Sequence, residues 1–212
     1  MKLVLIGAPA AGKGTQAKRL IEHYNIAHIS TGDMLREEIS KGTELGEKVK
    51  SVMASGGLVS DDLIIEIVKA RIAEDDCKNG FIFDGFPRTV VQAEKLDEII
   101  GHIDRAVFIN APDEVMLQRL TARETCPKCG ATYNKLSLPS KVAGVCDACG
   151  EKLTQRKDDT VEAGKARLKT FHEQSEPLVD YYKKQNLLFE VNGLMDIDEV
   201  TKSIISGLGE KA

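Results

Sequence analysis

A glycine-rich loop near the amino end constrains this chain more than any other feature. Residues 7–15 read GAPAAGKGT and follow directly on the apolar run KLVLIG at 2–7. Gly7, Gly12 and Lys13 fit the pattern G-x-x-x-x-G-K. A strand that turns through such a loop into a helix directs several backbone N–H groups, and the positive end of the helix, at one point. The loop therefore predicts a phosphate-binding site.

One position of the loop departs from that pattern. A hydroxyl residue normally follows the lysine and binds Mg²⁺, but Gly14 stands there and the hydroxyl comes one residue later, at Thr15. We therefore expect Thr15 to contact phosphate at the start of the helix. Because Mg²⁺ keeps several of its waters by preference, we expect nucleotide phosphates and water to hold it.

The rest of the chain alternates short apolar runs with helical periodicity. This predicts an α/β fold with a P-loop NTPase-like five-stranded parallel sheet and helices on both faces. Strands are expected at 2–7, 27–30, 81–85, 104–111 and 187–193. Helices are expected at about 13–24, 43–55, 90–100 and 113–122, and from about 31, 61, 160 and 196. Two segments interrupt the alternation, a helical one at 30–59 and a cysteine-rich one at 122–159, and we expect both at the rim where ligands bind.

Composition limits the class of partner. The 212 residues carry a net charge of −4, and no long run of like charge occurs. This argues against a nucleic-acid or membrane surface. The first apolar run is too short for a signal peptide, so a cytoplasmic enzyme is expected. A rival hypothesis is a nucleotide-switched module that grips nucleic acid with a zinc ribbon, but the cysteine-rich segment has Tyr133 as its single aromatic residue.

Four of the five cysteines have the spacing of a metal site. They form two C-x-x-C pairs sixteen residues apart, at Cys126, Cys129, Cys146 and Cys149. This spacing is typical of a closed, structural Zn²⁺ site with four thiolates, one ion per chain. A pair of disulfides and an iron–sulfur centre are the alternatives. Cys77 is expected to be a buried filler.

The stretch DGFPR at 84–88 follows a predicted strand on the same rim as the glycine loop. Asp84 is placed to hold Mg²⁺, directly or through its waters. Of these two, we expect the contact through water, with Asp84 in the outer shell of the ion. The turn at Pro87 directs Arg88 toward the cleft. An aspartate after a strand is otherwise more often a turn or cap residue, but a P-loop opposite it favours the metal role.

Four motifs in this order resemble the adenylate kinase family over essentially the whole chain. They are GAPAAGKGTQ, STGDMLR, DGFPRTVVQAE and TQRKDDTVEAGKARL, and the cysteine-rich segment resembles the zinc-bearing lid of the long bacterial type. The resemblance implies reversible, Mg²⁺-dependent transfer of a phosphoryl group from ATP to AMP, giving two ADP, by a monomer. It divides the chain into a core (1–29, 60–121 and 160–212), an AMP-binding insert (30–59) and a zinc-containing lid over ATP (122–159).

The resemblance also implies roles for individual residues. It places around ATP the residues Ala10, Ala11, Gly12, Lys13, Gly14, Thr15, Arg119, Arg123, Thr132, Tyr133 and Met195. It places around AMP the residues Thr31, Arg36, Gly57, Leu58, Val59, Gly85, Phe86, Pro87, Arg88, Gln92, Arg156 and Arg167. The catalytic group is then Lys13, Asp84, Arg88, Arg123, Arg156, Asp158, Asp159 and Arg167. A kinase for another nucleoside monophosphate, such as UMP or CMP, is the alternative.

Elementary chemistry supports an arginine-rich site. Two polyphosphates that meet end to end concentrate negative charge, and arginine binds phosphate bidentately while staying charged. Two local questions stay open in the sequence. Asp159 could form a capping box with Glu162, could with Asp158 orient Arg156 or Arg123, or could do both. The family commonly has glycine where this chain has Ala10, so this alanine either has negative φ or the loop is adjusted.

Overall fold

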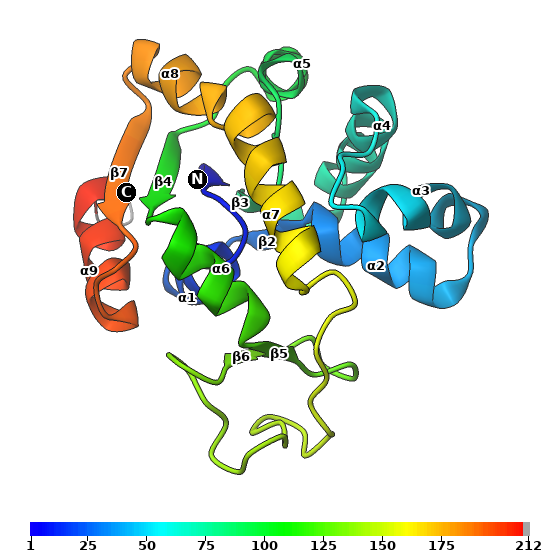
Figure 1. Cartoon of the computed structure of the whole chain (residues 1–212). Helices are drawn as coiled ribbons and strands as arrows, with labels where there is room; N and C mark the ends of the chain where they lie inside the picture. Colours follow the sequence, from blue (N-terminus) through cyan, green and yellow to red (C-terminus); the bar gives the residue numbers. More distant parts are fainter. Residues whose placement is uncertain (210–212) are drawn as a thin grey trace.

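The central sheet has five parallel strands. In the computed structural model, which describes residues 1–209, their order is β2 (Ala27–Ser30), β3 (Phe81–Asp84), β1 (Lys2–Ile6), β4 (Arg105–Asn110) and β7 (Leu188–Asn192) (Figure 1). Residues 3–6 of β1 are at most 3% exposed, because the strand is central and covered on both faces. The five predicted strands are confirmed, and each end lies within one residue of its predicted place.

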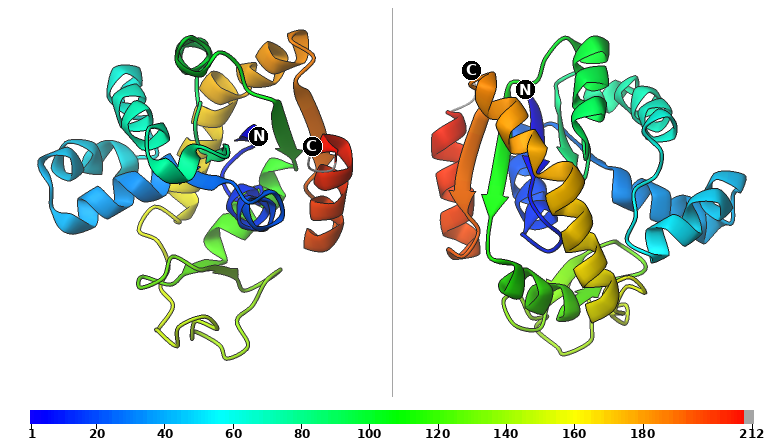
Figure 2. Two further views of the ribbon diagram at one scale, coloured as in Figure 1. Left: turned by 180° about the vertical axis from the view of Figure 1, so that it is seen from behind. Right: turned by 45° about the horizontal axis from the view of Figure 1, so that its top comes forward.

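Helices cover both faces of this sheet. On one face, α1 (Lys13–Tyr24) packs beside α9 (Ile197–Leu208), as the view from behind in Figure 2 shows. On the other lie α5 (Val90–Ile100), α7 (Val161–Thr170) and α8 (Pro177–Lys184). The chain passes from β1 to β2 in one direction and from β3 to β4 in the other. Because parallel crossovers are right-handed, this reversal puts α1 and α5 on opposite faces and opens a crevice at the carboxyl ends of the strands.

Two segments extend from this edge. The helix α2 (Thr31–Lys41) follows β2 without a gap and pairs with α3 (Glu44–Ala54), and α4 (Asp61–Ile72) and the 3₁₀ turn η1 (Asp75–Cys77) then lead back to β3. The helix α6 (Asp113–Thr121) runs from β4 into the second segment, at the bottom of Figure 1. That segment contains the antiparallel pair β5 (Arg123–Thr125) and β6 (Thr132–Asn134), with loops around them.

Side-chain hydroxyls cap two of the helices. Ser30 caps α2 by accepting a hydrogen bond from the Asp33 N–H at 3.4 Å. Thr160 caps α7 by accepting from the Ala163 N–H at 3.1 Å. The predicted capping box of Asp159 with Glu162 is therefore wrong, because Asp159 is fully buried elsewhere and a hydroxyl one residue later does the capping.

The helix predicted from residue 160 is continuous but irregular. A π-helical turn, η2 (Phe171–Ser175), joins α7 to α8. The N–H of Glu176 bonds to the carbonyl of Phe171 five residues earlier, at 2.8 Å. Pro177 follows directly, and proline has no N–H and crowds the carbonyl four residues before it. The widened turn accommodates the proline without ending the helix.

Within residues 1–209, no helix has the length and apolar composition needed to cross a membrane.

His172 gives the fold a pH-dependent contact. Its ring lies 2.8 Å from the Glu176 carboxylate and 3.0 Å from that of Asp113 at the start of α6, and these bonds raise the histidine's pKa above its usual 6.5. The stabilisation is complete below pH 6.5 and is lost as the pH rises through the raised pKa. Because the side chain is 42% exposed, we expect His172→Gln to lower the free energy of unfolding by less than about 1 kcal/mol at pH 6, and by less at pH 9.

Urea unfolding at the two pH values checks this prediction. His102→Gln is the matched control, because this exposed histidine makes no ion pair within residues 1–209. Equal losses for His172→Gln at pH 6 and pH 9 would contradict the assignment.

Candidate functional site

The glycine loop lies between β1 and α1 at the carboxyl edge of the sheet. Gly12 is the cap residue of α1 and has φ 104°, a conformation that favours glycine. Because glycine has no side chain to bond the first N–H groups of the helix, these groups are available to an anion. A Cβ at Gly14 would lie 3.2 Å from Oδ2 of Asp84. The glycine that replaces the expected hydroxyl residue therefore leaves room for this carboxylate.

Ala10 has positive φ, at 64°. The alternative of a negative φ at this position is wrong, and the alanine adopts the left-handed conformation that glycine has without strain.

We expect Ala10→Gly to raise the free energy of unfolding by about 0.5–1 kcal/mol, because relieved strain exceeds the entropy that glycine adds to the unfolded chain. Ala11→Gly is the matched control, since Ala11 is buried and absent from the positive-φ residues, and it should lower stability. A melting temperature that falls equally in both variants would contradict the prediction.

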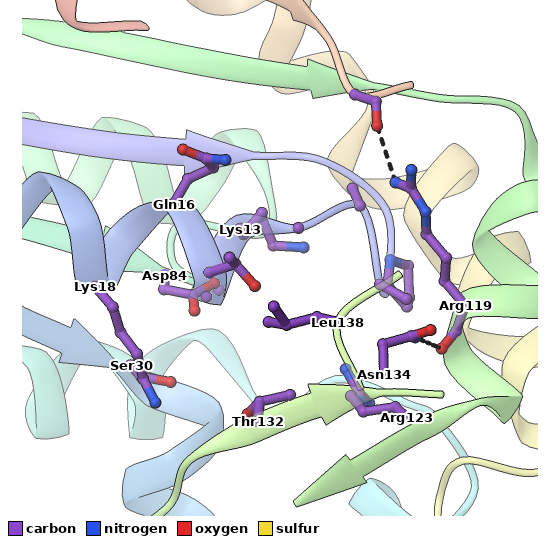
Figure 3. Close-up of a pocket in the computed structure, with 18 of the residues that line it drawn as sticks. Lys13, Gln16, Lys18, Ser30, Asp84, Arg119, Arg123, Thr132, Asn134 and Leu138 are labelled. Carbon is purple, nitrogen blue, oxygen red and sulfur yellow. Dashed lines mark hydrogen bonds between the residues drawn. The ribbon is translucent and has the colours of Figure 1, made fainter. Parts of the chain in front are cut away.

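Lys13 and Asp84 lie together at the floor of the site (Figure 3). The Lys13 ammonium donates to the carbonyls of Gly7 at 2.7 Å and Ala8 at 2.9 Å. Burial lowers the pKa of Lys13 to about 8, although Asp84 opposes this shift. Burial acts to raise the pKa of Asp84, but neighbouring His28 and Lys13 outweigh it and hold that pKa below its usual value. Asp84 is therefore an ionised oxygen donor beside a cation, which is a chemistry that suits Mg²⁺ with its waters.

Around this floor stands a cluster of arginines held by two aspartates. Asp159 is fully buried and accepts from both Nε and Nη2 of Arg123. Arg167 donates to Asp158 at 2.9 Å and to Asp159 at 3.4 Å. Of the predicted orienting contacts, Asp159 with Arg123 is thus present, whereas Asp158 holds Arg167 and not Arg156. Burial lowers the pKa of Arg167 to about 10. The protein therefore disfavours the charged form of this side chain, and a bound anion would stabilise it.

Arg156 approaches the cluster from the other side. Its Nη2 lies 3.6 Å from Oδ1 of Asp33, which also accepts from Arg36 at 2.5 Å. Burial lowers the pKa of Arg156 to about 10, and the charge of Arg36 acts in the same direction. Asp33 therefore links the segment 30–59 to the segment 122–159.

A cavity of about 480 Å³ extends from this cluster beneath the segment 122–159. All eleven residues that the sequence assigned to ATP line it, from Ala10 to Met195, together with Arg88, Arg156 and Arg167. In Figure 3, Lys13 and Asp84 lie on one side and Arg119, Arg123 and Asn134 on the other. Arg119 donates to the Gly193 carbonyl at 2.9 Å and Asn134 donates to the Arg119 carbonyl at 2.7 Å. The volume of this cavity is typical of a small-molecule site.

A second, smaller cavity adjoins the first. Nine of the twelve residues assigned to AMP line it: Thr31, Arg36, Gly57, Leu58, Val59, Gly85, Arg88, Gln92 and Arg167. Gly85, Arg36, Arg88 and Arg167 line both cavities. The site therefore consists of two spaces that meet at arginine side chains.

Some assigned residues lie elsewhere. Phe86 is fully buried against Phe83 in the core, and Pro87 lines neither of these two cavities. Tyr133 lines the larger cavity, but its hydroxyl accepts from the Asp147 N–H at 2.8 Å and faces the Cys146 sulfur.

Sequence reasoning missed several residues that line the larger cavity, among them His28, Asp33 and Leu138. Nε2 of His28 lies 3.8 Å from Asp84, because β2 and β3 pair with Ser30 beside Asp84. Its place near the carboxyl end of a predicted strand was the available signal. Asp33 lay within the quoted motif STGDMLR, and its neighbour Arg36 one turn away was the signal there. Leu138 lies in an irregular loop, and nothing in the sequence indicated that it would line the cavity.

The four cysteines of the segment 122–159 form a cluster that could hold a metal ion. Their sulfur atoms all lie within 4.8 Å of one another, with 3.4 Å between Cys126 and Cys149 and 3.5 Å between Cys129 and Cys146. A tetrahedral ion bound at about 2.3 Å from each sulfur needs sulfurs about 3.8 Å apart, so this donor set fits one ion. These separations are far longer than a disulfide of about 2.05 Å, so the disulfide alternative is wrong. Cys77 is buried, as predicted.

Comparison with known proteins agrees with this geometry. The sequence model described as adenylate kinase matches residues 5–187. An adenylate kinase of Caldicellulosiruptor bescii is 48% identical over 213 residues, covering 99% of each chain. One of Clostridium tetani is 50% identical and also covers 99% of each chain, and one of Finegoldia magna is 49% identical, covering 98% of this chain and 99% of its own. The chain therefore belongs to the adenylate kinase family.

Proposed function

We propose that the protein is an ATP:AMP phosphotransferase that forms two ADP reversibly and balances the adenine nucleotides. The observation that carries this proposal is the pair of cavities that meet at shared arginines. One cavity starts at a phosphate-binding loop, and the other is framed by the segment 30–59. Two nucleotides placed with their phosphates toward each other would meet at Arg88 and Arg167.

The reaction needs no general base. An oxygen of the AMP phosphate attacks the γ-phosphorus of ATP, a new P–O bond forms, and the bond to the β–γ bridging oxygen breaks. The transition state spreads negative charge over the equatorial oxygens. Lys13 and Arg88 would stabilise this charge from below, and Arg123, Arg156 and Arg167 from above. Because Asp158 and Asp159 hold Arg167 and Arg123 in advance, little reorganisation is needed during transfer.

Two metal ions have separate places in this proposal. Mg²⁺ bound with the nucleotide would neutralise phosphate charge, and Asp84 would hold its waters. Thr15, at the start of α1, is proposed as a phosphate contact. A Zn²⁺ ion bound by the four cysteines would be structural, because four thiolates leave it no open position. Reduced thiolates of this kind suit the cytoplasm, where we expect the protein to act as a monomer.

The division into parts follows from the same proposal. The segment 122–159 would act as a lid over ATP, and the segment 30–59 as the AMP-binding insert, with 1–29, 60–121 and 160–212 as the core. Closing both parts over the nucleotides excludes water, which otherwise would hydrolyse ATP.

A base-comparison assay tests this proposal. ADP formation is measured from ATP with AMP, UMP, CMP or GMP in parallel, with and without Mg²⁺. We expect turnover that requires Mg²⁺ and is at least about 100-fold higher in kcat/KM with AMP, since buried polar contacts discriminate strongly between bases. Faster turnover with UMP or CMP would support the other monophosphate kinases instead.

A further inference from the structure

Two hydrogen bonds hold the backbone of Arg88, one at its N–H and one at its carbonyl. The N–H of Arg88 donates to Oε1 of Gln92 at 2.7 Å, and Gln92 itself is held by Asp61 at 2.7 Å. The carbonyl of Arg88 accepts from the hydroxyl of Ser175 at 2.8 Å, 87 residues away in the chain. The first contact is local to the loop, whereas the second ties the loop to the turn between α7 and α8.

The hydroxyl of Ser175 lies in the π-helical turn η2 and bonds outside its own helix. A serine in a helix commonly donates to the carbonyl four residues before it, as the hydroxyl of Thr170 does to the Ala166 carbonyl at 3.0 Å. Ser175 instead donates to a residue 87 positions away. Ser175 is only 9% exposed, so its hydroxyl must bond within the protein. It bonds to Arg88.

A cavity of about 80 Å³ lies beside this contact, lined by Lys13, Arg88, Arg167 and Ser175 among others. Side chains beside a cavity have fewer contacts to oppose movement. A directed hydrogen bond between two residues that line such a cavity therefore has more influence on position than it would in a dense core.

We infer that Ser175 is a positioning residue for phosphoryl transfer, which holds the backbone of Arg88 so that its guanidinium meets the phosphates where the two cavities join. The guanidinium itself is anchored by one contact, from Nε to the Gly85 carbonyl at 2.7 Å, which leaves its terminal nitrogens to bind an anion. This inference rests on the proposed function. It adds η2, a turn outside both cavities, to the parts that set the geometry of transfer.

A double-mutant cycle tests the inference. We expect Ser175→Ala to lower kcat about 10-fold, since small misplacements of a charged group reduce transfer strongly, and to leave KM for ATP within about 2-fold. Ser175→Thr should restore kcat to within about 2-fold, because it keeps the hydroxyl. In an Arg88→Lys background, Ser175→Ala should lower kcat less than about 2-fold, because the group it positions is no longer there.

The controls separate positioning from folding. Melting temperatures of all four variants confirm that each is folded at the assay temperature. An unchanged kcat in Ser175→Ala, or the same 10-fold loss in the Arg88→Lys background, would overturn the inference while the proposed function stands. If the wild-type chain shows no AMP-dependent turnover, the proposed function fails and this inference fails with it.

Discussion

Replacing Lys13 by methionine is expected to lower kcat by about 10²–10³-fold, with the protein still folded. The Lys13 ammonium lies inside the glycine loop, bonded to two of its carbonyls and close to Asp84. In that position it is the cation nearest the start of α1, where the outer phosphates of ATP would bind. Methionine keeps the length and volume of the side chain but removes its charge, so the loss is one of transition-state stabilisation.

Lys2→Met is the matched control for this prediction. Lys2 also donates to a backbone carbonyl, that of Ile100 at 2.9 Å, but it lies at the opposite end of β1. It should retain full kcat. Steady-state kinetics with AMP and ATP measures both variants, and a Lys13→Met enzyme within 3-fold of wild type would contradict the role of Lys13.

Removing the metal from the four cysteines is expected to lower the melting temperature by about 10 °C, through loss of folding free energy in the segment 122–159. This segment has little else to hold it together. Its own buried cluster consists of Cys126, Tyr133, Cys146 and Leu153, and its two strands have three residues each. Two of those four residues, Cys126 and Cys146, are proposed ligands, so the core of the segment would depend on its metal.

Metal analysis and calorimetry before and after chelation check this prediction. Cys129→Ser removes an exposed ligand and should reproduce the effect of chelation, whereas Cys77→Ala should bind metal and respond to chelator as wild type does. One zinc per chain is expected. Iron with sulfide would favour the iron–sulfur alternative, and a metal-free protein with an unchanged melting temperature would contradict a structural role.

The sheet was predictable because its three central strands contain unbroken apolar runs, at 3–6, 81–83 and 106–109. A strand buried on both faces tolerates no alternation, so its length is visible in the sequence. The cysteine site was equally visible, since metal coordination requires a fixed spacing of ligands.

What the sequence did not settle depends on contacts between distant residues. Asp159 was compatible with a helix cap and with an arginine partner, and only the approach of Arg123 across 36 residues decides between them. Ala10 was compatible with two backbone conformations, and the closure of the loop on Lys13 selects the rarer one. The contact of Ser175 with Arg88 has no local signal in the sequence, because it depends on the turn η2 lying against the loop that follows β3.

The most direct test of the account is ADP formation from purified protein, ATP and Mg²⁺, measured with and without AMP. The two adjoining cavities predict that ADP forms rapidly only when AMP is present, with two ADP produced for each AMP consumed. ATP hydrolysis at the same rate without AMP, or no turnover with both nucleotides present, would contradict it.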